Sequence, residues 1–366
     1  MSLKDRKREQ AAADAADAAR LRPMRTLAEF LAGFVPPDYL IDQTFQKRYL
    51  YATTAPTGAG KTAVWITIAA HVATGTPLHG REIVKSKVLY CAGENPDDIR
   101  ARLIMQVEKM GLDPAAVDIV VVDGTMDIGK DAVRNHVRAE AEKHGPFGLV
   151  IIDTSAAYFY GEEENSNRDM LDHARAMRSL VDLPGGPAVV VLCHPVKSSE
   201  SNLPRGGGAF VAEIDGNTYI TKNGAVVELC RHDKFRGPMW EPMAFRLDSG
   251  TSEKLRDSRS RPVWVVTATP ISDSEKAELD DTADRRRGEL LALMKAKAKL
   301  SMMAMARELG WRTKDGEPNK SLVQRLLDGL RREKLVETKD GHPALTTAGR
   351  KIAGEWRGPD QGEMHI

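Results

Sequence analysis

Residues 55–62 carry two glycines, a lysine and a threonine at the spacing of a phosphate-binding loop. An apolar, strand-like run at 49–52 precedes them, and a helix-like run at 63–74 follows. Gly58 and Gly60 let the backbone turn its N–H groups around phosphate oxygens. A helix that begins there points its unpaired N–H groups at the same anion. We therefore expect ATP and Mg²⁺ at this loop; the alternative is a glycine-rich turn before an ordinary helix.

The side chains of the loop suggest individual roles. The Lys61 ammonium would reach the β- and γ-phosphates, and the Thr62 hydroxyl would ligate Mg²⁺. The usual first glycine is replaced by Ala55, which departs from the pattern. The residues expected to surround the nucleotide are Thr57, Gly58, Ala59, Gly60, Lys61, Thr62 and Ala63.

Two carboxylates follow apolar strand-like runs. Asp153 ends the run 148–153, where ligands gather in parallel sheets, and it would hold Mg²⁺ directly or through water. The alternative is a strand-end Asp that caps the next segment. Glu94 follows the run 88–91 and could orient or deprotonate the attacking water. Its alternative is a local role at a helix start, with Asn95 as the cap and Pro96 as the first helical residue.

Three basic side chains are further candidates. His194 follows the strand-like run 188–193 and could hydrogen-bond the γ-phosphate, although a single histidine at a strand end is often structural. Lys234 and Arg236 lie in the stretch 233–238, which has the composition of a turn. They could reach the phosphate of a neighbouring subunit; the alternative is an ordinary charged hairpin.

Composition limits the class of protein. The 366 residues carry a net charge of +1, with 42% hydrophobic and 29% charged residues, as in a soluble globular protein of about two domains. This charge argues against a chain that coats nucleic acid through bulk charge alone. No apolar run is long enough to predict a membrane-spanning helix. The cysteines, Cys91, Cys193 and Cys230, each end an apolar run and indicate buried, reduced thiols in a cytoplasmic protein.

Strand-like and helix-like segments alternate through residues 27–270, after a charged arm at 1–26. Alternation of this kind predicts an α/β fold with a mostly parallel central sheet. The later strand candidates have no helices between them and suggest an antiparallel extension. The strand candidates are 49–52, 87–91, 119–122, 149–152, 188–193, 217–221, 226–231, 244–247 and 263–267. The helix candidates between them are 63–74, 96–110, 130–143 and 167–181.

The remainder of the chain changes character. The acidic, polar segment 271–284 reads as a linker, and 358–366 as a tail. Residues 285–357 contain helix-like segments at 288–297, 301–309 and 320–333, followed by hairpin-like runs at 335–338 and 343–346. Three helices and a hairpin suggest a small winged helix-turn-helix domain. The alternative is a helical cap with no DNA role.

Basic residues lie on or near the third of these helices: Lys320, Arg325, Arg331 and Arg332. They could contact the phosphates of duplex DNA if this is a recognition helix. The alternative is a solvated helix face, because lysine and arginine are exposed on most proteins.

Over roughly residues 28–250 the chain resembles the RepA-type hexameric replicative helicases, within the RecA-like ATPases that also include DnaB. The order of many short motifs makes the resemblance more specific than any single motif. They comprise residues 36–40, the phosphate loop, 78–80, 92–94, 151–154, 161–165, 193–194, 205–209 and 234–237.

The resemblance implies a role for each candidate side chain. Glu94 becomes the catalytic carboxylate, Asp153 the magnesium acid, and His194 the sensor of the γ-phosphate. Lys234 and Arg236 become fingers that act in trans, so the active form would be a homo-oligomeric ring, in this family a hexamer.

The stretch 205–209 resembles a loop that faces the central channel of the ring and touches single-stranded DNA. It carries glycine where relatives often carry serine, and a flexible glycine turn is its alternative. The winged helix is not part of the minimal RepA-type motor.

The leading hypothesis is therefore an ATP-hydrolysing DNA motor, a replicative helicase of plasmid or phage type. One alternative is an ATPase that loads or regulates other replication proteins. Another is a sequence-specific DNA-binding regulator whose ATP site only controls assembly.

Overall fold

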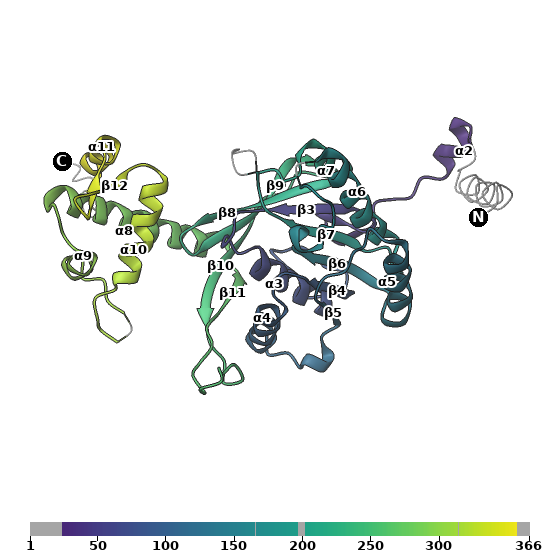
Figure 1. The fold of residues 1–366 in the computed structure, drawn as a ribbon, viewed down its shortest axis with the longest axis horizontal. Coiled ribbons are helices and arrows are strands. Elements are labelled where there is room, and N and C mark those ends of the chain that lie inside the picture. The colour runs from purple at the N-terminus through teal and green to yellow at the C-terminus, as the bar shows by residue number, and fades with distance from the viewer. Residues whose placement is uncertain (1–23, 165, 197–201, 314, 357–366) are drawn as a thin grey trace. The chain divides into compact units, whose positions relative to one another are not determined.

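The computed structural model describes residues 24–164, 166–196, 202–313 and 315–356 (Figure 1). The predicted tail and residues 1–23 of the predicted arm lie outside the described residues. The chain divides into two units, residues 1–38 and residues 39–366. None of the described helices combines the length and the apolar character that a membrane crossing requires.

The first unit contains one described helix, α2 (Leu27–Ala32). Thr26 caps it: its hydroxyl accepts from the Glu29 N–H, while the Glu29 carboxylate accepts from the Thr26 N–H at 2.8 Å. This reciprocal arrangement satisfies two of the N–H groups that a helix start leaves open. The helix buries none of its residues.

The second unit is built on a nine-stranded sheet of order β11-β10-β9-β8-β3-β7-β6-β4-β5. The pairings among β3 to β8 are parallel, whereas β9, β10 and β11 extend the sheet antiparallel, as predicted. The strands are β3 (Leu50–Thr54), β4 (Lys87–Ala92), β5 (Ile119–Asp123), β6 (Phe147–Asp153), β7 (Ala188–Cys193), β8 (Gly216–Asn223), β9 (Val226–Phe235), β10 (Met243–Gly250) and β11 (Val265–Pro270). The sequence did not predict the small hairpin β1 (Tyr39–Ile41) and β2 (Phe45–Gln46) before them.

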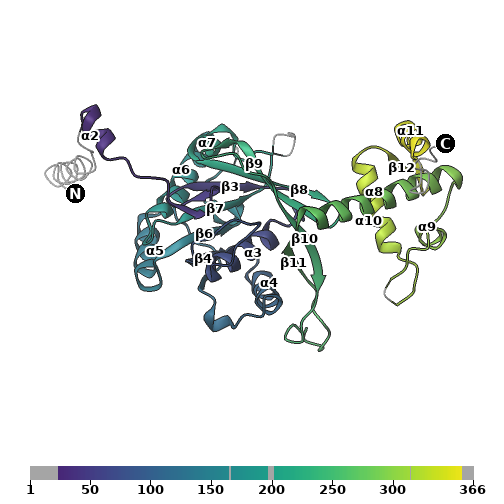
Figure 2. The same ribbon diagram turned by 180° about the vertical axis from the view of Figure 1, so that it is seen from behind.

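Helices cover both faces of this sheet (Figures 1 and 2). On one face α3 (Lys61–Thr74) and α4 (Pro96–Lys109) pack over a core that includes Trp65. On the other face lie α5 (Asp131–His144), α6 (Asn167–Arg178) and α7 (Gly207–Glu213), with a core that includes Met177. Strands β6 and β7 are buried along their whole length, which explains their unbroken apolar sequences. Every described observation agrees with an α/β fold around a mostly parallel sheet.

A buried carboxylate ties three elements together beside the sheet. Asp215 is 3% exposed and bonds Arg178 of α6 at 2.9 Å and Arg236, which follows β9, at 2.8 Å. It also accepts the backbone N–H of Leu50 at the start of β3. A buried charge is tolerated when it is paired and hydrogen-bonded in this way.

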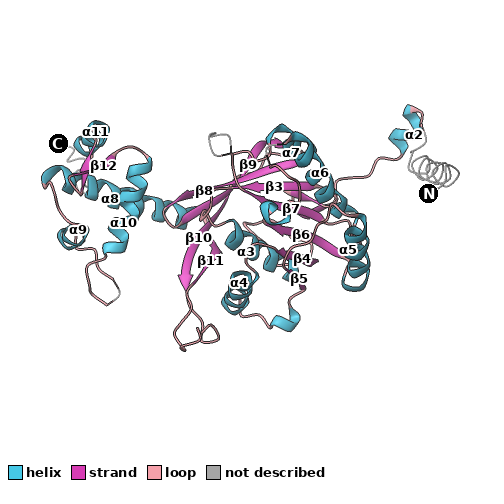
Figure 3. Ribbon diagram, viewed as in Figure 1, coloured by secondary structure: helices cyan, strands magenta, loops and turns pink. Residues whose placement is uncertain are grey.

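The described residues of the C-terminal part form four helices and a hairpin, which Figure 3 shows by secondary structure. The elements are α8 (Asp273–Ala296), α9 (Met302–Glu308), α10 (Lys320–Arg332), β12 (Val336–Lys339), β13 (His342–Leu345) and α11 (Thr347–Glu355). They share an apolar core that includes Leu290, Leu327 and Leu345. The sequence predicted the three helices and the hairpin but not α11.

The predicted linker at 271–284 is corrected by the structure. Residues 273–284 are the first half of α8, which Ser272 and Glu275 open with a capping box. Of the acidic residues that suggested a linker, Asp273 and Glu275 lie in the first turn of this helix, where a negative charge interacts favourably with the helix dipole.

Asp215→Ala should lower the free energy of unfolding by about 1–3 kcal/mol, because it leaves the buried Leu50 N–H without its acceptor and leaves Arg178 with Glu213 as its remaining carboxylate partner. Urea denaturation of the purified variant measures this. The Arg236 side chain is 66% exposed, so Arg236→Ala is the matched control and should cost no more than about 1 kcal/mol. Equal losses for the two variants would contradict the interpretation.

Candidate active site

The phosphate-binding loop lies between the carboxyl end of β3 and α3. Gly58 and Gly60 have φ angles of +75° and +98°, which glycine adopts without strain. Ala55 is buried, has no positive φ, and donates its N–H to the Cys193 carbonyl at 3.1 Å. A methyl group is therefore compatible with the position of the usual first glycine.

The start of α3 offers free donors. Its cap residue, Gly60, has no side chain to accept from the first turn. Val64 is the first residue of the helix to bond back, to the Gly60 carbonyl at 3.0 Å. Among the described residues, the backbone N–H groups of Lys61, Thr62 and Ala63 have no backbone acceptor. An uncapped helix start behind a glycine loop suits a phosphate group.

Lys61 is held over the loop by backbone carbonyls. Its Nζ donates to the Ala55 oxygen at 2.6 Å and to the Pro56 oxygen at 3.2 Å, and the residue is 6% exposed. Burial lowers the pKa of Lys61, whereas Cys193, Asp153 and Glu94 nearby act to raise it. The cation therefore lies in a poorly hydrated place where the charge of a phosphate would be felt strongly.

Asp153 and Thr62 come together, as the magnesium hypothesis requires. The Asp153 carboxylate is 2% exposed, accepts the Tyr90 hydroxyl at 2.6 Å and also bonds Thr62. Burial raises the pKa of Asp153, while the bonds from Tyr90 and Thr62 lower it. No group of three or more metal-ligating side chains occurs in the described ranges. One hydroxyl and one carboxylate fit Mg²⁺, which keeps several waters and completes its shell with phosphate oxygens.

Glu94 follows β4, whose last residue, Ala92, pairs with Asp153. The Gly93 and Glu94 N–H groups donate to the Asp153 carbonyl at 2.9 and 3.3 Å. A side chain at Gly93 would come within 2.4 Å of the Tyr158 ring, so glycine is required there. Asn95 caps α4, with Pro96 as its first residue, as the local alternative proposed. Glu94 itself is exposed, and its charge acts on both Lys61 and Asp153.

His194 follows β7 beside the phosphate loop. Its Nδ1 lies 3.5 Å from the Thr57 hydroxyl oxygen. Burial and the Lys61 charge lower the pKa of His194, which favours the neutral ring. The structure thus gathers Lys61, Thr62, Glu94, Asp153 and His194 at one edge of the sheet.

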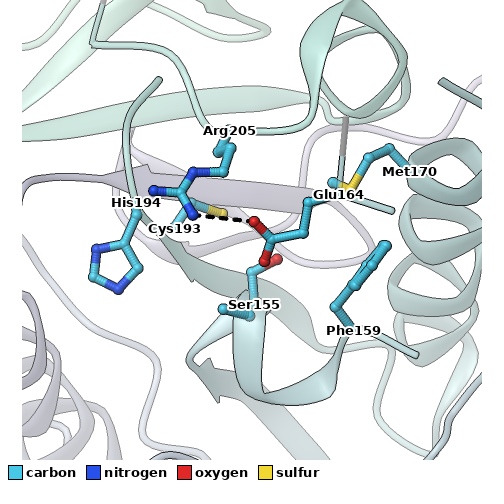
Figure 4. A pocket seen from close by; sticks show the side chains of 8 residues that line it. Ser155, Phe159, Glu164, Met170, Cys193, His194 and Arg205 are labelled. Atoms are coloured by element: carbon cyan, nitrogen blue, oxygen red, sulfur yellow. Dashed lines mark hydrogen bonds and ion pairs between the residues drawn. The ribbon is translucent and has the colours of Figure 1, made fainter. Parts of the chain in front are cut away.

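The stretch 205–209 is not the loop that the sequence suggested. Gly207 to Ala209 form the first turn of α7, and Gly206, with φ of +112°, precedes it. A side chain at Gly206 would meet Met170 at 2.2 Å, so packing as well as backbone conformation requires glycine. Arg205 pairs with Glu164 at 3.1 Å in the pocket beside His194 (Figure 4).

Lys234 and Arg236 lie far from this edge. Lys234 belongs to β9, which runs to Phe235, so the predicted turn begins later than expected. Phe235 pairs with Gly216, and Gly216 pairs with Tyr51, near the amino end of β3. The phosphate loop leaves the opposite end of the same strand.

Sequence reasoning missed Tyr90 and His173. Tyr90 lies inside an apolar strand and could not be distinguished there from an ordinary core residue. His173 of α6 is 7% exposed, stacks on Phe210, and lies 3.0 Å from the Ser155 hydroxyl through its Nε2. Its sequence context is a polar helix, which carries no signal of burial.

Comparison with known proteins gives one family. Residues 15–200, about half of the chain, match the family model described as an AAA domain. The matched span contains the phosphate loop, Glu94, Asp153 and His194. No curated protein matches the chain.

Burial of His173 lowers its pKa from 6.5 to about 4. Between these pH values the unfolded chain binds a proton at this site and the folded chain does not, so stability falls as pH falls. The loss at pH 4 should approach about 3 kcal/mol. Urea denaturation at pH 7 and pH 4.5 should show a flatter pH dependence for His173→Gln than for the unchanged protein. His136→Gln, at an exposed position on α5, is the control and should keep the pH dependence of the unchanged protein. The same pH dependence of the free energy of unfolding in His173→Gln would contradict the expectation.

Proposed function

This chain belongs to the AAA domain family and is a P-loop ATPase, and from that premise we propose that it is an ATP-driven motor on single-stranded DNA. The finer proposal is a replicative helicase of the RepA-like type. The observation that supports it most is that the nucleotide-facing residues and the pair Lys234 and Arg236 lie at opposite ends of the sheet strands. The nucleotide-facing residues lie at one end of β3, whereas Lys234 and Arg236 lie at the other.

The proposed chemistry assigns the phosphates of ATP to the loop N–H groups and Lys61. Thr62 and Asp153 would hold Mg²⁺, which neutralises phosphate charge when it is bound. Glu94 would orient the attacking water and accept its proton, since its carboxylate is exposed beside Asp153. His194 contacts Thr57 of the loop and would report whether a γ-phosphate is present.

Lys234 and Arg236 would serve the site of a neighbouring subunit. The sheet aligns them with the amino end of β3, so they cannot reach the phosphate loop of their own chain at its carboxyl end. Fingers that act between subunits require an assembly of several copies, and we propose the hexameric ring of the resembled family. Hydrolysis in each site would then depend on its neighbour.

The C-terminal elements support a second candidate, a DNA-binding regulator. The order α8, α9, α10, β12, β13 would fit the winged helix that we propose here, and α10 exposes Lys320, Arg325 and Arg332. Arg331 is partly committed to Asp328 at 2.8 Å. Exposed cations on this helix would suit duplex phosphates. This candidate predicts sequence-specific duplex binding with negligible ATP turnover.

ATP turnover with and without single-stranded DNA tests the proposal. We expect DNA to stimulate turnover, and Lys61→Ala to abolish it because the phosphates lose their cation. An unwinding assay would follow. Nucleotide binding without turnover, together with tight duplex binding, would overturn the motor and favour the regulator.

A mixing experiment tests action in trans. Arg236→Ala should reduce turnover by about 10³-fold or more, in the range measured for arginine fingers. In mixed rings, Lys61→Ala subunits supply Arg236 to neighbours that carry an intact loop, so the mixture should recover activity that neither variant has alone. Arg236→Lys controls for loss of the Asp215 ion pair, since it keeps the charge. Absence of recovery in rings shown to be mixed would contradict the arrangement.

A further inference from the structure

The connection between β10 and β11 projects from the sheet as a long, ordered hairpin (Figures 1 and 2). It presents an unusual combination of side chains to solvent. Trp264, just before β11, is 67% exposed, and Arg256, Arg259 and Arg261 are exposed with it. An exposed tryptophan ring beside arginines offers an apolar, planar surface and positive charge to the same partner.

The hairpin holds its shape through Asp257. The Asp257 carboxylate accepts the N–H groups of Arg259 and Arg261 at 2.8 and 2.9 Å. It also accepts Nε of Arg261 at 2.7 Å. The Asp257 N–H donates in turn to the Arg261 carbonyl. These hydrogen bonds hold the tip of the hairpin in one conformation, so little conformational entropy remains to be lost on binding.

Two of the cations are already neutralised and two are not. Arg261 pairs with Asp257, and Lys254 pairs with Glu108 at 3.1 Å. Among the described residues, the hairpin therefore carries two arginines, Arg256 and Arg259, without an acidic partner.

The backbone places Arg256 and Trp264 on the same side of the hairpin. Arg256 pairs with Pro262, and the Val263 N–H donates to the Leu255 carbonyl at 3.0 Å. Side chains alternate between faces along an extended chain, so Trp264 shares the face of Pro262. Leu255 points to the other face and is buried, which agrees with this alternation. Diagonal neighbours in such a ladder are about 7–8 Å apart.

We propose that this hairpin is a contact for single-stranded nucleic acid, with one base stacked on Trp264 and the adjacent phosphates bound by Arg256 and Arg259. Base stacking on an exposed aromatic ring requires an unpaired base, because a duplex hides the faces of its bases. An arginine beside the ring suits the phosphate that each nucleotide carries. The proposal rests on the proposed function as a motor on single-stranded DNA, and it adds a contact outside the stretch 205–209.

The test is equilibrium binding of a fluorescein-labelled oligo(dT) to the full chain by anisotropy, with a non-hydrolysable ATP analogue present. Trp264→Ala should weaken binding roughly 5- to 100-fold, the range that stacking of one base gives. Trp264→Phe should keep most of the affinity, because a planar ring remains. Arg256→Ala/Arg259→Ala should weaken binding and reduce the slope of log K against log salt by about 1.4, or 0.7 for each phosphate contact.

The control is Arg138→Ala/Arg175→Ala, which removes two exposed arginines from α5 and α6 and should leave the salt slope unchanged. Basal ATP turnover without DNA and the sedimentation coefficient should be the same for all variants. Tight binding by the unchanged protein with equal binding by the hairpin variants would overturn the proposal and leave the motor intact. Failure of the unchanged protein to bind single strands would overturn both. A smaller assembly in Trp264→Ala would instead assign the tryptophan to contacts between subunits, which also overturns the proposal.

Discussion

The parallel register of β4, β6, β7 and β3 is the constraint on which the site depends. Ala92 pairs with Asp153, Ile152 with Val191, and Cys193 with Thr54, so these strands end level with one another. Neighbouring strands lie about 4.8 Å apart. Each strand ends in, or is soon followed by, a residue of the site. Side chains from distant parts of the sequence therefore meet at the carboxyl ends of these strands.

Burial gives this edge its electrostatic character. Lys61 and Asp153 are both removed from water. Burial lowers the pKa of Lys61 and raises the pKa of Asp153, so it favours the neutral form of each. Two carbonyls hold the amine, and the Tyr90 and Thr62 hydroxyls hold the carboxylate. Groups prepared in this way need little reorganisation when a charged ligand arrives, which is the usual source of strong electrostatic stabilisation in active sites.

At the amino end of β3, the structure is organised around Asp215. Asp215 joins Arg236, Arg178 and the start of β3, so the position of Arg236 is linked to the strand that ends in the phosphate loop. Strand β3 thus connects Arg236, which would face a neighbouring subunit, with the phosphate loop of the same chain. The proposed ring would use this connection in every subunit.

The sequence by itself predicted the sheet strands, the helices α3 to α6 and the residues of the phosphate loop, because long apolar runs and glycine spacing are local signals. It also anticipated that Asp153, Glu94 and His194 would lie at strand ends, from which their convergence follows once the strands are parallel. It did not predict α7, the helical form of 273–284 or the burial of His173, since glycine-rich or polar segments resemble loops until their packing partners are known. Only the tertiary structure separated Arg236 from the nucleotide edge and paired it with Asp215, because that contact joins residues whose closeness depends on the register of β8 and β9.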